Sequence, residues 1–207
     1  MALENWLAFA AASAVLLVIP GPTILTVISY SVTHGRRVKW PLVLAVALGD
    51  STALFLSLVG LGALLATSAF LFTLIKWMGG LYLIYLGFKL LRSGVSAPAP
   101  DEPAPASTWK LFFNTYAVTA LNPKGIIFFV AFLPQFLRPD RDIGAQLWTL
   151  AVTFVVLATL NASLYAAFAA SARRLLSSAV ARDRFNLVGG CLLSGAGVWA
   201  LLAKRNV

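Results

Sequence analysis

The stretch Val18-Ile19-Pro20-Gly21-Pro22-Thr23-Ile24 places a proline break inside an apolar segment near the start of the chain. A second break, Leu121-Asn122-Pro123-Lys124-Gly125, interrupts another apolar segment about half a chain later. Proline inside a helix removes a backbone donor and clashes with the carbonyl four residues back, so each break exposes unpaired backbone at membrane depth. Such backbone normally lines a cavity. Two interrupted segments at corresponding places in the two halves indicate the substrate site of a repeat-built transporter.

The composition is that of an integral membrane protein. Of the 207 residues, 60% are hydrophobic and 11% are charged, and the mean hydropathy is +0.87, whereas about a quarter of residues are charged in soluble domains. The net charge is +9. Because the basic residues lie at the ends of apolar spans, we attribute this charge to contact with anionic lipid head groups and not to nucleic acid.

Motifs for enzymatic or metal chemistry are missing from the sequence. The single cysteine, Cys191, cannot form an internal disulfide, and no cysteine pair is present for thiol exchange or a zinc site. The sequence has no HExxH motif, Gly-rich phosphate loop or Ser/His pair. We therefore expect a protein that is not an enzyme and that has no cofactor or metal.

Six apolar runs are long enough to span a bilayer, which takes roughly 20 residues. We place them at Trp6 to Ser31, Pro41 to Ala66, Phe70 to Leu91, Leu111 to Phe136, Ala145 to Ala170 and Leu187 to Ala203. The segment 93–107 is polar and proline-rich, which predicts a flexible linker between a first repeat (1–92) and a second repeat (108–207). Because three helices are an odd number, the second repeat must enter the membrane in the opposite sense. The sequence thus predicts an all-α membrane fold of two inverted three-helix repeats with broken helices 1 and 4.

The basic residues near the span ends predict the orientation, because they are kept on the cytoplasmic side. The segments after the first, third and fifth spans carry ten basic residues, against four on the opposite side. The ten are Arg36, Arg37, Lys39, Lys89, Arg92, Lys110, Arg173, Arg174, Arg182 and Arg184, and the four are Arg138, Arg141, Lys204 and Arg205. We expect a protein of the cytoplasmic membrane with both termini on the extracytoplasmic side and the linker in the cytoplasm.

Asp50 lies about nine residues into the second span, with no acidic neighbour in that span. A carboxylate at such depth costs at least about 2.5 kcal/mol, so it should face the bundle interior and find a partner. A purely structural role, locking two helices through Lys124 or a backbone donor, is one interpretation. We favour a functional role, because ionisable groups inside a membrane are functional by default.

The two breaks also read as helix starts. Asn122 is a favoured N-cap and Pro123 suits the first helical position, and Gly21-Pro22 repeats this pattern. Each break creates a half-helix whose free donors and positive dipole end suit an anionic ligand group. An ordinary proline kink is the alternative for either motif alone. The pairing of the two motifs at the depth of Asp50 favours a site.

Asn161 lies about 16 residues into the fifth span, at a place resembling that of Asp50 in the first half. Two interpretations of Asn161 are equally acceptable, a helix-to-helix hydrogen bond and a contact with a ligand. The small residues Gly189, Gly190, Ser194 and Gly197 in the last span suggest close helix packing, either within the subunit or in a homo-oligomer. The candidate substrate-binding set is Pro20, Gly21, Pro22, Thr23, Asp50, Asn122, Pro123, Lys124 and Asn161.

These residues together resemble the lysine-exporter and threonine/homoserine-exporter superfamily of bacterial amino-acid efflux transporters. The resemblance extends over essentially the whole chain and rests on five motifs. They are Pro20-Gly21-Pro22, Gly49-Asp50, Gly79-Gly80-Leu81-Tyr82-Leu83-Ile84-Tyr85-Leu86-Gly87, Leu121-Asn122-Pro123-Lys124-Gly125 and Phe132-Leu133-Pro134-Gln135-Phe136. It implies a six-helix secondary exporter of amino acids or close derivatives, driven by the proton gradient or the membrane potential and often oligomeric. Where that family commonly has Asp or Asn after the first Pro-Gly-Pro, this chain has Thr23, whose hydroxyl can still contact a ligand but carries no charge.

We expect an aqueous cavity between the two repeats at the bilayer midplane. The half-helix starts at Thr23 and Lys124 would receive the substrate carboxylate, and Asp50 would take its ammonium group or exchange a proton. A metal-cation exporter of the same fold is an alternative, but the spans have no soft or imidazole ligands and only Asp50 offers a hard charged oxygen. A non-transporting membrane scaffold is a second alternative, and it predicts no thermal stabilisation by any amino acid.

Overall fold

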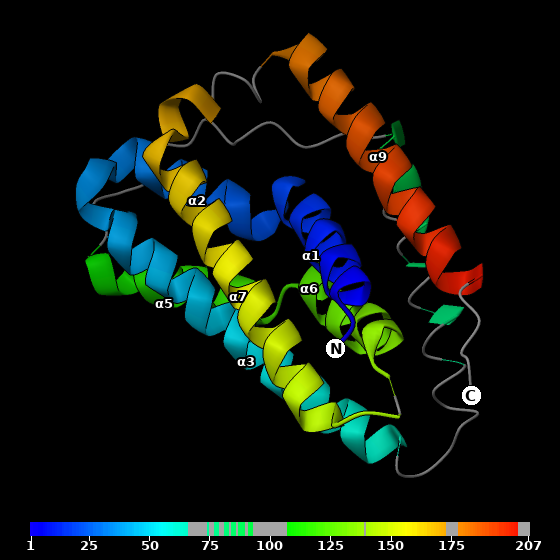
Figure 1. Cartoon of the computed structure of the whole chain (residues 1–207). Coiled ribbons are helices and arrows are strands. Elements are labelled where there is room, and N and C mark those ends of the chain that lie inside the picture. Colours follow the sequence, from blue (N-terminus) through cyan, green and yellow to red (C-terminus); the bar gives the residue numbers. More distant parts are fainter. Residues whose placement is uncertain are drawn as a thin grey trace.

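The computed structural model describes residues 1–65, 107–138, 140–172 and 178–202, together with positions 74, 77–78, 81–82, 84–85, 87–89 and 91–92. All regular elements in these residues are helical (Figure 1). Half of the predicted third span, including Lys76, and nearly all of the predicted linker lie outside the described residues. Only Ser107 of the linker is described, and it is the N-cap of the next helix, where its side chain accepts a hydrogen bond from the Lys110 amide.

The first predicted span is two helices, as the proline motif indicates. Helix α1 (Leu3–Val18) ends before Pro20, and α2 (Pro22–His34) begins at the second proline. Ile19 and Gly21 between them are extended, because a residue that precedes proline is driven out of the helical region. The chain then turns through a 3₁₀ segment, η1 (Gly35–Val38), into the long helix α3 (Lys39–Leu65). Figure 1 shows this sharp turn between α2 and α3.

The fourth predicted span is also interrupted. Helix α5 (Thr108–Ala120) ends, and α6 (Pro123–Ile127) starts with Asn122 as its N-cap. The winding then changes to a π-helix, η2 (Phe128–Phe132), and to a 3₁₀ turn, η3 (Leu133–Phe136). Pro134 has no backbone N–H, so the α-helical hydrogen bonding cannot continue through it.

Two further helices complete the described part of the second half. Helix α7 (Ile143–Ala167) matches the fifth predicted span closely. Helix α9 (Ala179–Leu202) begins well before Leu187, where the last span was expected to start. Arg182 and Arg184, which were expected between the fifth and the last span, therefore lie within this helix. Hydropathy marks only the apolar part of a helix, whereas the backbone hydrogen bonds continue through the polar turns that precede it.

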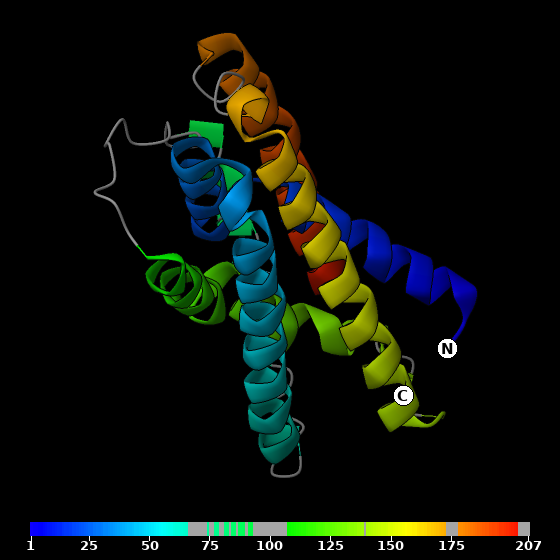
Figure 2. The ribbon, with the colours of Figure 1, turned by 90° about the vertical axis from the view of Figure 1, so that its left-hand side faces the viewer.

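The core joins the N-terminal helix to the second half. Helix α3 packs most extensively against α5 and α7, and α1 also packs on α7, and Figure 2 shows α3 and α7 side by side. A cluster of buried phenylalanines lies between α1, η2, η3 and α7, consisting of Phe9, Phe128, Phe129, Phe132, Phe136 and Phe154. The ring centroids of Phe129 and Phe154 are 4.7 Å apart, and those of Phe9 and Phe136 are 5.3 Å apart. This cluster holds both broken helices in one body.

Three helical stretches of the described residues are long and apolar enough to cross a membrane, namely Pro22–Gly60, Thr108–Phe136 and Ile143–Ala167. Their outer faces carry exposed large apolar side chains, such as Phe55, Trp109 and Trp148. On α9, the small residue Gly190 lies against the predicted third span, because a Cβ atom there would come within 2.8 Å of the Gly87 carbonyl oxygen. At this glycine, close packing takes place within the subunit.

Candidate functional site

The two helix breaks border one small cavity. Its walls include six of the nine predicted site residues, namely Gly21, Thr23, Asp50, Asn122, Lys124 and Asn161. The remaining lining residues are Leu16, Leu17, Ile24, Val46, Gly125, Phe154 and Ala158. The prolines Pro20, Pro22 and Pro123 do not line it, and they act by ending and starting the helices. The volume of this cavity is about 30 Å³, which is enough for a water or two and for no larger solute.

The C-terminal end of α1 is bound by side chains from the second half of the chain. A helix leaves its last four carbonyl groups without partners inside the helix. Here the ammonium group of Lys124 donates to the carbonyl oxygens of Leu16 and Ile19, both at 2.8 Å. The carbonyl oxygens between them also accept hydrogen bonds. Leu17 accepts from the Asn161 amide at 3.0 Å, and Val18 from the Tyr165 hydroxyl at 2.8 Å. Three side chains therefore satisfy four successive carbonyls across the two halves.

Lys124 thus has a definite position, which the sequence did not predict. Its ammonium group lies at the end of α1, where the helix dipole is negative and a cation is stabilised. Gly21 lies next to it, because a Cβ atom at residue 21 would be in ordinary van der Waals contact with the lysine nitrogen, at 3.4 Å. The side chain is only partly buried and borders the cavity. Lys124 is therefore both a link between the halves and a charge next to the cavity.

The starts of the two half-helices meet at this cavity. The side-chain amide of Asn122 donates a hydrogen bond to the Thr23 hydroxyl at 3.2 Å. This bond joins the residue before α6 to the first turn of α2. The Asn122 side-chain oxygen accepts from the Lys124 backbone amide at 3.1 Å, so the start of α6 has its own cap. No side chain caps the start of α2, which is fully described. The α2 start is therefore the one with backbone donors available to a ligand.

Asp50 lies in α3 on the wall of the same cavity, and 7% of its surface is exposed. Within the described part of the chain, no residue donates a hydrogen bond to its carboxylate or forms an ion pair with it. It and Lys124 nevertheless attract each other electrostatically. The buried carboxylate thus keeps its hydrogen-bonding capacity for something inside the cavity, such as water or a ligand.

Gly49 positions Asp50 by allowing a close approach of α3 and α5. A Cβ atom at residue 49 would lie 2.7 Å from the Cβ of Thr119 and 3.0 Å from the carbonyl oxygen of Tyr116. One turn further on, the Thr52 and Tyr116 hydroxyl groups are hydrogen-bonded at 3.1 Å. These contacts hold the carboxylate beside the second helix break.

Sequence reasoning missed Tyr165. A signal was available, because Tyr165 follows Asn161 by four residues and therefore lies on the same face of the fifth span. For Asn161, the structure has the helix-to-helix hydrogen bond and also places the residue on the cavity wall. Together the site offers a cation, an uncapped helix start and a carboxylate. These groups complement a small solute that carries both an anionic and a cationic group.

Comparison with known proteins finds relatives along nearly the whole chain. A family model described as LysE type translocator matches residues 14–204. The chain is 32% identical over 204 residues to an uncharacterized membrane protein of Vibrio cholerae, which covers 99% of this chain and 100% of that protein. It is 31% identical over 169 residues to a homoserine/homoserine lactone efflux protein of Salmonella typhi, which covers 82% of each.

A leucine efflux protein of Klebsiella pneumoniae is 31% identical over 160 residues, covering 74% of this chain and 73% of that protein. No solved structure matches the chain significantly. Because the family model spans nearly the whole sequence, including both helix breaks, the chain belongs to the LysE type translocator family of membrane proteins.

Proposed function

We propose that this protein is a secondary active exporter of amino acids or close derivatives across the bacterial cytoplasmic membrane. The observation that carries the proposal is the placement of Lys124, the uncapped α2 start and Asp50 around one cavity between two helix breaks. An amino acid presents a carboxylate and an ammonium group at fixed separation, and these three features are their counterparts. Relatives named as efflux proteins for homoserine or its lactone and for leucine support the same class of cargo.

The proposed architecture is six membrane helices in two inverted repeats, residues 1–92 and 108–207, joined by the linker 93–107. In its favour, each half contains a broken helix with a glycine or asparagine before the proline of the second piece. Each half also has a long helix that contributes a polar side chain to the cavity, Asp50 from α3 and Asn161 from α7. The charge distribution supports an orientation with both termini outside the cytoplasm.

In the proposed binding mode, the substrate carboxylate lies at the start of α2 near Thr23 and is shared with the Lys124 ammonium. The substrate ammonium group pairs with Asp50. A cavity that holds only a water or two corresponds to a closed state. Opening requires the second half to move away from α1, which would release the carbonyls that Lys124, Asn161 and Tyr165 hold.

Proton exchange at Asp50 supplies a sufficient driving force in this scheme. Moving one charge through 100 mV yields about 2.3 kcal/mol, which corresponds to roughly fiftyfold accumulation. Asp50 suits the role because it is buried beside the cavity without a bonded partner among the described residues.

The test is counterflow of radiolabelled amino acids in proteoliposomes, with a panel that includes homoserine and leucine. We expect Asp50→Asn to abolish counterflow, and Asp140→Asn, at an exposed position that does not line the cavity, to leave it unchanged. Thermal unfolding in detergent checks that both variants remain folded. Full counterflow by Asp50→Asn would remove that residue from substrate binding. If the wild-type protein neither transports nor is thermally stabilised by any amino acid in the panel, the exporter proposal is wrong.

A further inference from the structure

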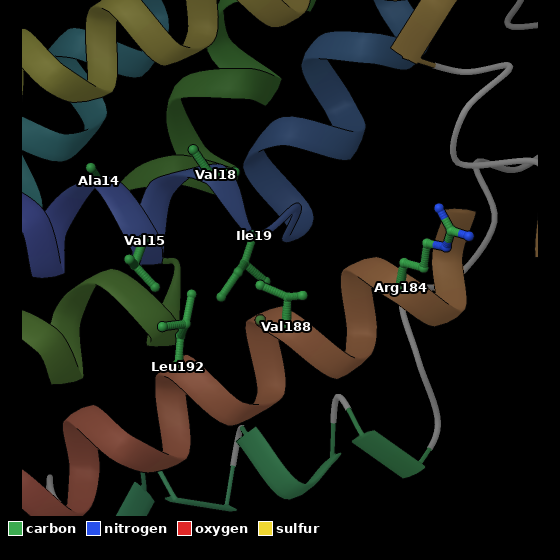
Figure 3. Close-up of a pocket in the computed structure, with 8 residues that line it drawn as sticks. Ala14, Val15, Val18, Ile19, Arg184, Val188 and Leu192 are labelled. Carbon is green, nitrogen blue, oxygen red and sulfur yellow. The ribbon is translucent and has the colours of Figure 1, made fainter. Parts of the chain in front are cut away.

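A second and much larger cavity lies outside the candidate site, in a groove between α1 and α9 (Figure 3). Its volume is about 450 Å³, and it shares no lining residue with the central cavity. The lining residues are Ala14, Val15, Val18, Ile19, Val188, Gly189, Leu192 and Arg184. Its size falls within the range of about 300–1,000 Å³ that is usual for small-molecule sites.

The lining surface is apolar, and Arg184 contributes to it only with carbon atoms, so that its guanidinium group lies beyond the end of the slot. Figure 3 shows Val15, Ile19, Val188 and Leu192 directed toward one another across the groove, with Arg184 beyond them at one end. The Arg184 side chain is exposed, and within the described part of the chain it forms no hydrogen bond or ion pair. A planar guanidinium group matches the geometry of a phosphate and binds it through two parallel hydrogen bonds.

The position of the charge along α9 fits a lipid that lies along the helix. Arg184 is in the second turn of a helix that begins at Ala179, so it is near the helix end, where lipid head groups lie. From Arg184 to Leu192 the groove follows α9 for about 12 Å, at 1.5 Å per residue. A phospholipid has the two parts that this arrangement requires, an apolar chain and a phosphate at its end.

We propose that the groove between α1 and α9 binds an anionic phospholipid, with one acyl chain between the helices and the phosphate on Arg184. The occupant also contacts the last turn of α1. Val18 and Ile19 line the groove with their side chains, and their carbonyl oxygens accept from Tyr165 and Lys124. A bound acyl chain therefore stabilises the turn of α1 that borders the central cavity.

The experiment compares two lipids on the delipidated, detergent-purified full chain by native mass spectrometry and thermal unfolding. Dioleoyl phosphatidylglycerol is the anionic lipid, and dioleoyl phosphatidylcholine is the net-neutral one with the same chains. We expect one tightly held phosphatidylglycerol per chain and a higher unfolding temperature with this lipid than with phosphatidylcholine. Arg184→Gln should weaken phosphatidylglycerol binding about fivefold, the effect of one basic side chain near an anionic membrane surface, and should leave phosphatidylcholine binding unchanged.

Two further variants separate the charge from the slot. Ala14→Phe fills the groove and should reduce binding of both lipids, whereas Arg36→Gln, at an exposed arginine outside the groove, should alter neither. The proposal is overturned if Arg184→Gln binds phosphatidylglycerol as tightly as the wild type does, or if Arg36→Gln lowers binding equally. It is also overturned if the delipidated protein is a dimer that excludes lipid from the groove. Since Arg184 is exposed, its substitution should not disturb folding, and this arm of the test does not depend on Ala14→Phe.

Discussion

The two helix breaks have the same proline chemistry, but their backbone groups are satisfied in different ways. At the first break, the carbonyls of Leu16 to Ile19 accept from Lys124, Asn161 and Tyr165, which lie more than a hundred residues away in sequence. At the second break, the backbone groups form local bonds, and one side-chain bond, from the Asn122 amide to the Thr23 hydroxyl, crosses to the first half. The amides of Leu121 and Asn122 donate to carbonyls of α5, and the Asn122 side chain caps α6.

From this difference we infer that the first break changes its bonds when the halves move, whereas the second break keeps its shape. The local bonds of the second break move with it as one unit, so the break keeps its shape when the halves move. The bonds of the first break cross between the halves and must be exchanged for others if the halves separate. The first break is therefore the one expected to change during transport, and the second is expected to remain rigid.

The largest effect should come from Lys124→Met, which removes the strongest bonds that cross the first break. Two charge-assisted hydrogen bonds at about 1.5 kcal/mol each predict a loss of roughly 3 kcal/mol in the free energy of unfolding, together with complete loss of counterflow. Lys110→Met, at an exposed lysine in the first turn of α5, is the matched control and should be neutral. Equal stability of the Lys124 variant and the wild type would show that the α1 carbonyls do not depend on this lysine.

A smaller effect on stability should follow from Gly49→Ala, which forces α3 away from the second break. The added methyl group meets the Thr119 side chain and the Tyr116 backbone, both held in α5, and such overpacking costs about 1–3 kcal/mol. Gly60→Ala in the same helix has nothing within 4 Å and should be neutral or slightly stabilising in thermal unfolding, because alanine has the higher helix propensity.

Gly21→Ala provides the corresponding change at the first break. Its methyl group approaches only the flexible end of Lys124, and its backbone angles are accessible to alanine. We expect Gly21→Ala to lower the rate of counterflow clearly and to change the unfolding temperature only slightly. A destabilisation as large as that of Gly49→Ala would mean that the first break is as rigid as the second.

Asn122→Ala should cost about 1 kcal/mol, the usual value of an N-cap. Hydrogen exchange measured by mass spectrometry tests the local character of the second break. We expect faster exchange at the start of α6, where the cap is lost, and little change in the last turn of α1. Faster exchange at both breaks would show that the Asn122 bond to Thr23 couples them.

The smallest effect should come from Tyr165→Phe, which removes a single neutral hydrogen bond across the first break. A helix-to-helix hydrogen bond in a membrane is worth about 0.6 kcal/mol on average. The same exchange measurement should show faster exchange at the end of α1 and no change around α6, the reverse of the pattern for Asn122→Ala. An unchanged α1 would mean that the Tyr165 bond is not maintained in the membrane.

Proline, glycine and capping residues act on the backbone next to them. The apolar composition shows that the chain requires a lipid environment. For this reason the two breaks, the N-cap at Asn122 and the membrane class can be read from the residues alone, and the burial of Asp50 follows from the cost of a charge in an apolar span. The early start of α9 could not be read in this way, since polar turns of a helix give no hydropathy signal.

The partners of the freed groups depend on contacts between segments far apart in the chain. Side-chain type did not indicate that Lys124 turns back to the end of α1, that Tyr165 joins it, or that the cavity is too small for a substrate. Local chemistry thus specifies where the backbone is left unpaired, whereas the packing of the two halves specifies which side chains pair with it.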